Sequence, residues 1–152
     1  MPGAPVLRLA IQADAPAVIA LWSEAGLIAS HNLPEQDFAR ALASASSDII
    51  LALEADQVVG SVMVGDDGHR AWIYYLAVAP DNRREHLGSR LIQAAETWAS
   101  DRGARKIQLM IRPGNEAVSQ FYDRQDYAET PRIVMAKWLD PEMAVVPTTD
   151  KT

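Results

Sequence analysis

Two apolar periods divide the first part of the chain. Residues 6–12 alternate between apolar and polar side chains, whereas the stretches between Asp14 and Gly26 and from Pro34 to about Ser44 repeat their apolar residues every three or four positions. Alternation is typical of a strand, and the longer period is typical of an amphipathic helix. We therefore expect one strand and then two helices, the first capped by Asp14. Its predicted buried face consists of Val18, Leu21 and Trp22.

The middle of the chain is rich in apolar and β-branched residues. The segments "DIILALE" and "QVVGSVMVG" are separated by a short Ala-Asp turn, and the Asp-Gly step of "DDGH" leads into "AWIYYLAVA". Asp-Gly between apolar runs is a strong hairpin signal. Three consecutive antiparallel strands are therefore predicted here.

The remaining elements alternate between helix and strand. A helix from about Leu87 to Arg102 precedes the strand "KIQLMI", and a helix from about Asn115 to Gln125 precedes the strand "RIVMAKWL". The order β-α-α-β-β-β-α-β-α-β predicts an α/β (α+β) fold with helices on both faces of a mixed sheet. We expect one domain over residues 1–139 and a disordered tail over 140–152.

Composition excludes several kinds of site. The chain has no cysteine, which removes disulfides, thiolate metal sites and cysteine nucleophiles, and its three histidines show no metal-ligand spacing. Its N-terminus shows no signal-peptide pattern, and no apolar run approaches the length of a membrane span, so we expect a soluble cytoplasmic protein. A net charge of −6 argues against a nucleic acid partner and weakly favours cationic ligands.

One strand-to-helix corner carries a local concentration of charge. The stretch "PDNRREHLGSRL" follows an apolar strand and leads into a helix, whose first-turn N–H groups and dipole form an anion site. Gly88 permits close approach of a ligand, and Arg83 and Arg84 suit phosphate oxygens. The segment therefore fits either a pyrophosphate site or a solvated loop whose arginines meet water or Glu85.

The surrounding pattern favours the first alternative. The sequence "YYLAVAPDNRREHLGSRLIQAAE…KIQLMIRPGNEAVSQFYDRQDY" resembles the GNAT superfamily of N-acetyltransferases, which has a strand ending in Val-x-Pro, a glycine-containing loop, a helix, and a strand leading to Asn-x-x-Ala and a Phe/Leu-Tyr pair. The resemblance extends from about Val6 to Leu139. The turn "GDDGHR" is similar to that of small bacterial members.

The resemblance implies a mostly antiparallel sheet of six to seven strands and transfer of an acetyl group from acetyl-CoA to a primary amine. The acceptor would be a small molecule or a peptide that attacks directly in a ternary complex, and the enzyme would be a monomer or a homodimer. The pantetheine arm would bind the backbone of Leu76, Ala77 and Val78, which splays at a bulge. The implied pyrophosphate loop comprises Arg83, Arg84, Glu85, His86, Leu87, Gly88 and Ser89. Asn115 would also hold the cofactor, and Tyr122 would protonate the departing thiolate.

The chain departs from the family pattern at three positions. His86 and Asp126 replace glycines, and both residue types tolerate a positive φ better than most if the backbone requires it. The His86 side chain could crowd the pyrophosphate or, when protonated, bind it. Met110 stands where some relatives have a glutamate base, so a degenerate acyl-CoA-binding or sensor protein is the alternative to an enzyme.

Substitutes for that base, and residues for the acceptor pocket, remain open. Asp67 and His69 in the turn, His31 in the early loop, or a water held by Tyr74 or its neighbour could accept the proton. Trp22 and His31 could line the pocket for the acceptor. The alternatives are that Asp67 only forms the turn and that Trp22 belongs to the core. Strand alternation predicts that the two tyrosines face opposite sides of the sheet.

Overall fold

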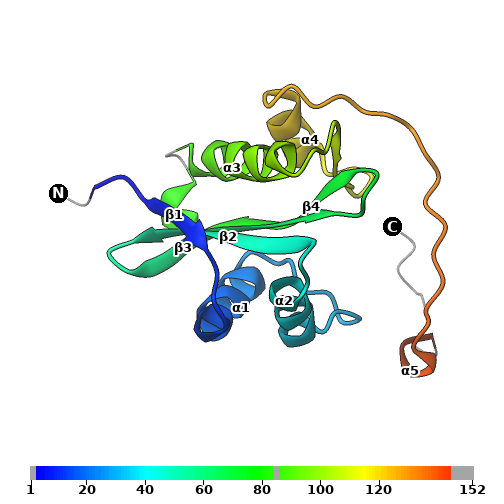
Figure 1. The fold of residues 1–152 in the computed structure, drawn as a ribbon, viewed down its shortest axis with the longest axis horizontal. Helices are drawn as coiled ribbons and strands as arrows, with labels where there is room; N and C mark the ends of the chain where they lie inside the picture. Colours follow the sequence, from blue (N-terminus) through cyan, green and yellow to red (C-terminus); the bar gives the residue numbers. More distant parts are fainter. Residues whose placement is uncertain (1–2, 84–85, 145–152) are drawn as a thin grey trace. The chain divides into compact units, whose positions relative to one another are not determined.

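A sheet with the strand order β1-β2-β3-β4-β5 organises the first part of the chain (Figure 1). The computed structural model describes residues 3–83 and 86–144, and the chain divides after residue 109 into two compact units, which we describe separately. Neighbouring strands from β1 to β4 are antiparallel, and β5 pairs parallel to β4. The strands are β1 (Val6–Leu9), β2 (Ser47–Glu54), β3 (Gln57–Asp66), β4 (Ala71–Val78) and β5 (Ile107–Gln108).

The mixed, mostly antiparallel sheet agrees with the predicted fold class, but the expected number of six to seven strands is wrong. Among the described residues the sheet has five strands. Residues 132–139, the predicted last strand, form neither helix nor strand, and β5 is shorter than "KIQLMI" suggests. A strand exists only where a neighbour accepts its hydrogen bonds, so β-propensity by itself does not create one.

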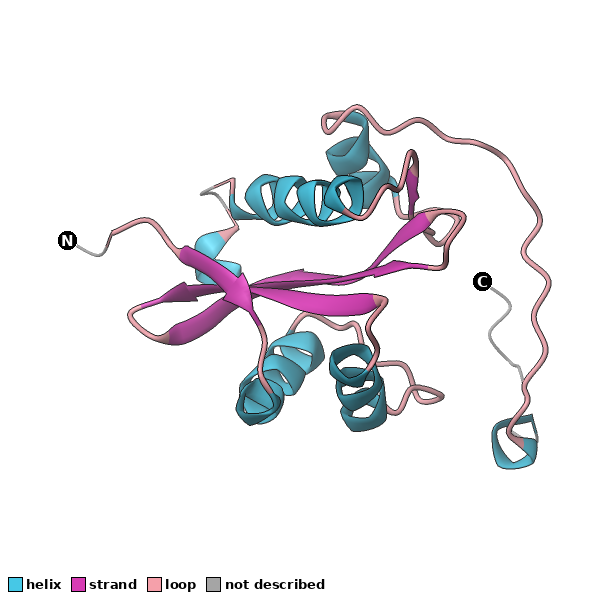
Figure 2. Ribbon diagram, viewed as in Figure 1, coloured by secondary structure: helices cyan, strands magenta, loops and turns pink. Residues whose placement is uncertain are grey.

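Helices cover both faces of this sheet, as predicted (Figure 2). Helices α1 (Ala15–Glu24) and α2 (Pro34–Ala43) lie on one face, and α3 (Leu87–Asp101) lies on the other. Short 3-10 helices, η1 (Gln12–Asp14) and η2 (Pro80–Asn82), precede α1 and α3. The expected face of α1 is buried, and with Phe38 of α2 it forms the core on that side of the sheet.

Asp14 occupies the N-cap position of α1, as predicted, but its side chain makes no capping hydrogen bond to that helix. Its carboxylate accepts two hydrogen bonds from the Arg8 guanidinium, at 2.8 and 2.9 Å, and one from the Ile11 N–H at 2.8 Å. The bond to Arg8 is the main reason why the pKa of Asp14 lies below its usual value. The side chain therefore joins β1 to the turn before α1, because a nearby cation competes successfully for its oxygens.

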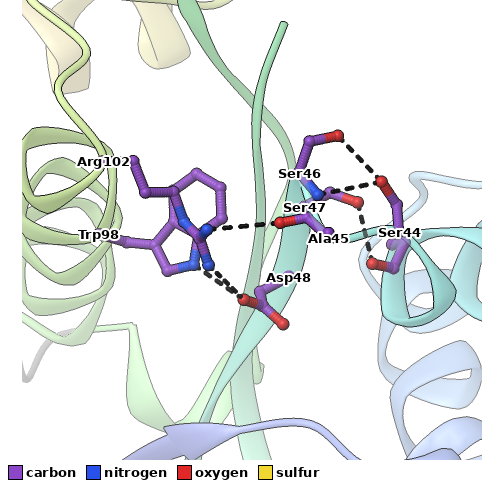
Figure 3. Close-up of polar contacts among 8 residues, drawn as sticks. Ser44, Ala45, Ser46, Ser47, Asp48, Trp98 and Arg102 are labelled. Atoms are coloured by element: carbon purple, nitrogen blue, oxygen red, sulfur yellow. Dashed lines mark hydrogen bonds and ion pairs between the residues drawn. The ribbon is translucent and has the colours of Figure 1, made fainter. Parts of the chain in front are cut away.

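Helix α3 lies close to β3 because β3 has a glycine at the crossing point. A Cβ atom on Gly60 would lie 2.9 Å from Leu91 Cδ1, and Leu91 is fully buried. At its other end, α3 is joined to β2 by polar contacts (Figure 3). Trp98 Nε1 donates to Asp48 Oδ2 at 2.8 Å, and the Arg102 guanidinium lies 3.9 Å above the Trp98 ring.

The described part of the second unit contains the helices α4 (Glu116–Asp123) and α5 (Pro141–Ala144). Asn115 caps α4, since its side chain accepts a hydrogen bond from the Val118 N–H at 3.4 Å. Helix α5 lies in the segment predicted to be a disordered tail, and residues 145–152 of that tail lie outside the described residues. In the part of the chain that the structure describes, no helix has the length and apolar character needed to cross a membrane.

Candidate active site

A bulge interrupts β4 at Tyr75 and Leu76, where the segment predicted to bind the pantetheine arm (Leu76, Ala77 and Val78) begins. The pairing register shifts between Ser61 and Met63 of β3, so that Tyr75 and Leu76 of β4 together face Val62. Tyr75 has a left-handed backbone, with φ of 52°. An extra residue in one strand bends that strand and interrupts the ladder of hydrogen bonds. The bulge that the family resemblance predicted is therefore present.

Three contacts hold Tyr75 in this conformation. Ser61 Oγ donates a hydrogen bond to its carbonyl oxygen at 3.2 Å. The phenol ring stacks on the indole of Trp22, with the ring centroids 4.0 Å apart and the planes 13° apart. The hydroxyl donates to Asp37 Oδ2 at 2.7 Å, and burial together with this bond raises the pKa of Tyr75. The side chain and the carbonyl are thus both fixed.

Sequence reasoning missed two of these partners. Asp37 lies in the first turn of α2, where its interaction with the helix dipole is enough to account for an acid. Ser61 lies in an otherwise apolar strand. The signal that could have revealed it is a hydroxyl in the middle of "VVGSVMV", because a buried hydroxyl requires a hydrogen-bond partner.

Among the described residues, no strand pairs with the outer edge of β4 beside the bulge. Within the described residues, β5 pairs with Ala71 and Trp72 of β4 and does not reach the later part of the strand. On that later part, the Val78 carbonyl accepts a hydrogen bond from Arg83 Nε at 3.4 Å. An unpaired strand edge presents backbone N–H and C=O groups to whatever lies beside it, including an extended ligand.

The corner between β4 and α3 has a left-handed residue at position 86, where the family pattern has a glycine. His86 is the N-cap of α3, is exposed, and has φ of 55°, which is the condition under which histidine replaces glycine at low cost. Leu87 is 1% exposed and anchors the start of the helix in the core. Gly88 and Ser89, in the first turn, are half-buried.

Arg83, Arg84 and Glu85 of this corner were predicted to contact the pyrophosphate, and the structure describes only Arg83. Arg83 is exposed and bonds to the strand before it. Arg84 and Glu85 lie outside the described residues.

Tyr74 and Tyr75 lie on the same face of the sheet, so the expectation that they face opposite sides is wrong. Tyr74 pairs with Met63, and residues directly opposite each other in a sheet point to the same face. Met63 packs against the cluster beneath α1 and α2, which Tyr75 also contacts. The bulge adds a residue between the paired positions and so changes the alternation. Tyr74 remains 44% exposed.

Asp67 has the contacts of a turn-forming residue. Its Oδ1 accepts hydrogen bonds from the N–H groups of His69 at 2.8 Å and Arg70 at 2.7 Å, and its Oδ2 accepts one from Trp72 Nε1 at 3.3 Å. The two backbone bonds are the main cause that lowers the pKa of Asp67 from its usual value. Partial burial of the Tyr74 phenol, followed by the negative charge of Asp67, raises the pKa of Tyr74. A lowered pKa makes this carboxylate a weaker base.

The other candidates for the acceptor side are separated in the structure. His69 is exposed in the turn, and His31 is half-buried in the loop between α1 and α2. Trp22 is completely buried, in agreement with the alternative that it belongs to the core and does not line the acceptor pocket.

In the second unit, Tyr122 is a buried phenol. It is 6% exposed, and its ring lies edge-on to those of Phe121 at 5.0 Å and Tyr127 at 5.4 Å between centroids. Burial raises its pKa to about 12, so the hydroxyl keeps its proton at neutral pH. Asp126, the other replacement of a family glycine, has φ of 66°, and Met110 is 54% exposed.

The chain is similar in sequence to known acetyltransferases and similar in fold to a solved one. The chain is 40% identical over 134 residues to an acetyltransferase of Pectobacterium atrosepticum, covering 88% of this chain and 94% of the relative. It is 37% identical over 133 residues, with the same coverage, to an acetyltransferase of Yersinia enterocolitica. A similar solved structure is the aminoglycoside N-acetyltransferase AAC(6')-Iy in complex with CoA, with a TM-score of 0.79 and 14% identity over 92% of this chain and 97% of that one.

The sequence profile of the acetyltransferase (GNAT) family matches residues 10–127, which include the bulge of β4, the corner before α3 and the whole of α4. Acetyltransferases of this family use acetyl-CoA as the acetyl donor. The chain therefore belongs to the GNAT family of acetyltransferases.

Proposed function

We propose that this protein is an N-acetyltransferase, which transfers the acetyl group of acetyl-CoA to a primary amine by direct attack in a ternary complex. The observation that carries the proposal is the bulge of β4 at Tyr75 and Leu76, beside a strand edge that β5 leaves unpaired within the described residues. Such an edge can bond an extended pantetheine arm while its N–H groups polarise a thioester carbonyl.

Two features of the first unit suit acetyl-CoA. The edge of β4 over Leu76, Ala77 and Val78 offers backbone donors and acceptors to an amide-containing chain. The first turn of α3 begins at the left-handed His86, and its N–H groups, with Gly88 and Ser89, suit a pyrophosphate beside Arg83. When bound, acetyl-CoA supplies a thioester whose carbon–sulfur bond breaks as the acceptor nitrogen bonds to the acetyl carbon.

Tyr122 is the proposed acid. Its Oη gives a proton to the departing sulfur and regains one from solvent, while the acceptor nitrogen loses a proton to a base. The raised pKa keeps the phenol protonated throughout the neutral range but also makes it a weaker acid, so support for this role comes from the match of Tyr122 to the family motif. Asn115 is proposed to contact the cofactor in addition to capping α4.

The acceptor is proposed to be a small amine or a peptide amine. The names of the solved structures with similar folds support a small amine, since several are aminoglycoside acetyltransferases, one of them in complex with a bisubstrate analogue. His31, His69, Asp67 and Tyr74 remain proposed acceptor-side residues. The exposed Met110 gives no carboxylate, so a bound water is the simplest proton acceptor. We propose that the enzyme acts in the cytoplasm, as a monomer or a homodimer.

Replacing Tyr122 by Phe tests the acid role. We expect Y122F to lower kcat at least about tenfold while the Kd of acetyl-CoA changes less than about twofold, because a leaving thiolate loses its donor and the binding edge is unchanged. Calorimetry measures the Kd, and release of CoA in the presence of an amine panel measures kcat. Y127F, which removes a neighbouring phenol, is the control, and an unchanged kcat in Y122F removes Tyr122 from this role.

The pH dependence supplies a second measurement on the same group. Because an acid must hold its proton and the pKa of Tyr122 is about 12, the wild-type kcat should not fall through ionisation of Tyr122 between pH 7 and about 10. A loss of kcat with a midpoint near the ordinary tyrosine value of about 10, absent in Y122F, would contradict this environment.

A degenerate acyl-CoA-binding or sensor protein is the second candidate, and Met110 and His86 favour it. Both proposals predict a calorimetric signal with acetyl-CoA. They differ in that the sensor releases no CoA with any amine in a panel of polyamines, amino sugars, aminoglycosides and peptides. Acetyl transfer to one of these amines decides for the enzyme.

A further inference from the structure

The peptide that joins Tyr75 to Leu76 is held from the interior of the first unit. The Tyr75 carbonyl oxygen accepts a hydrogen bond from Ser61 Oγ at 3.2 Å, and Ser61 Oγ accepts one from Trp22 Nε1 at 2.9 Å. Ser61 and Trp22 are both 0% exposed. These bonds form a relay from α1 through β3 to β4, which we call the Trp22–Ser61–Tyr75 relay, and water does not compete with it.

The relay determines the direction of the Leu76 N–H. In a trans peptide the carbonyl and the following N–H point in opposite directions, and the described residues contain no cis peptide. Because the Tyr75 carbonyl points to Ser61 on β3, the Leu76 N–H points away from β3. It therefore points to the outer edge of β4, which within the described residues β5 pairs with only at Ala71 and Trp72.

A buried hydroxyl at position 61 destabilises the fold unless it forms hydrogen bonds such as these. Val62 and Val64, which follow it in β3, are fully buried apolar residues. Burying a hydroxyl without partners is unfavourable, so an apolar side chain would be the ordinary choice in this strand. The Ser61 hydroxyl instead has two hydrogen-bond partners. It donates to the carbonyl of Tyr75, the left-handed residue of the bulge, and accepts from the Trp22 indole, which stacks on the Tyr75 ring.

We propose that Ser61 is a positioning residue, which through the relay directs the Leu76 N–H at the carbonyl oxygen of the bound thioester. The inference rests on the proposed function, in which that oxygen gains negative charge as the amine attacks. A donor that is already oriented stabilises this charge without reorganising during the reaction. Trp22 then serves the reaction through Ser61, although it is too deeply buried to contact the acceptor.

Kinetics of S61A provide the first test. Removing the hydroxyl frees the Tyr75 carbonyl, so we expect kcat to fall about tenfold, roughly the effect of one hydrogen bond in the transition state. The Kd of CoA, which lacks the acetyl group, should stay within about twofold. S61T keeps the hydroxyl and should recover most of the lost kcat. If S61A does not fold, W22F removes the first donor of the relay and should lower kcat about threefold.

Trp98 provides a matched control. Its Nε1 donates to Asp48 Oδ2 at 2.8 Å, so W98F also removes one indole hydrogen bond between a helix and the sheet, but on the face covered by α3. Like S61A, W98F should lower the Tm. Measured well below the Tm, W98F should leave kcat unchanged. An equal loss of kcat in W98F and S61A would show that Ser61 acts only through stability and would overturn the proposal.

An NMR measurement on Leu76 separates this inference from the proposed function. In wild type, the Leu76 amide proton should shift further downfield with acetyl-CoA than with CoA, because CoA lacks the thioester carbonyl oxygen to which this N–H is proposed to donate. In S61A that difference should shrink by at least half. If wild type binds acetyl-CoA but acetylates no amine, the proposed enzyme fails, whereas the Leu76 shift still decides the relay. An unchanged difference in S61A overturns it.

Discussion

Two residues with a left-handed backbone lie in or next to the segment proposed to bind acetyl-CoA. Tyr75 has φ of 52° in β4, and His86 has φ of 55° before α3. A side chain in this region costs about 1–2 kcal/mol, so the surroundings must supply compensating contacts. Tyr75 has such contacts in its ring stack and two hydrogen bonds. His86 is exposed, and its cost is limited because histidine adopts this conformation more easily than most residues.

Substitutions of His86 test this interpretation. H86V should lower the free energy of unfolding by about 1–2 kcal/mol, because a β-branched side chain is strongly disfavoured at positive φ. H86G should remain within about 0.5 kcal/mol of wild type, since relief of strain offsets the greater freedom of the unfolded chain. Urea denaturation measures both variants.

The control for this series is H69V, at another exposed histidine, whose backbone is not left-handed. It should change the free energy of unfolding by less than about 0.5 kcal/mol. Equal stability of H86V and H86G would mean that position 86 does not hold a left-handed conformation in solution.

At the level of elements, the short pairing between β5 and β4 matters most for the site. The two strands pair at Ala71 and Trp72, and the bulge of β4 follows a few residues later. Residues 132–139 have the sequence pattern of a strand but do not form one. Ile133 and Met135 of this segment are each 91% exposed.

Exposure of this segment has a direct consequence for stability. I133A should change the free energy of unfolding by less than about 0.5 kcal/mol, because the side chain is already in water in the native state. I73A, at a residue of β4 that is 4% exposed, should cost about 2–5 kcal/mol. A cost above about 1 kcal/mol for I133A would indicate that residues 132–139 do pair as a strand in solution.

At the scale of the whole molecule, the described structure divides into two compact units at residue 109. The sequence contains no linker between them and predicts one domain over residues 1–139, which remains a prediction. The proposed cofactor residues Leu76 and Arg83 belong to the first unit, and the proposed acid Tyr122 belongs to the second. A single domain over residues 1–139 requires that the two units unfold in a cooperative transition.

Hydrogen exchange in increasing urea measures this cooperation. If residues 1–139 are one domain, amides of α3 and of α4 should lose their protection at the same urea concentration, with one free energy of opening. Ala95 in α3 and Tyr122 in α4 are suitable probes because both are buried. Loss of protection in α4 at a clearly lower urea concentration would show that the second unit unfolds independently.

Local pattern was sufficient for most elements. The helical period around Val18, Leu21 and Trp22 predicted a buried face correctly, because the period of a helix and the side that it buries are both recorded in the order of residues. The Asp-Gly turn and the family motif likewise predicted the three antiparallel strands and the bulge. The low cost of a left-handed His86 was predictable from its residue type alone.

The sequence by itself therefore determined the order of elements as far as α4, the helices on both faces and the membership of an acetyltransferase family. Only the tertiary structure decided which side chains meet across the sheet. Ser61 bonds to Trp22, 39 positions away, and Asp37 bonds to Tyr75, 38 positions away. The length of β5, the contacts of Asp14 and the shared face of the two tyrosines also depended on partners distant in the chain. Hydrogen bonds between separate elements leave no period in a sequence, which is why the relay behind Leu76 became visible only in the folded protein.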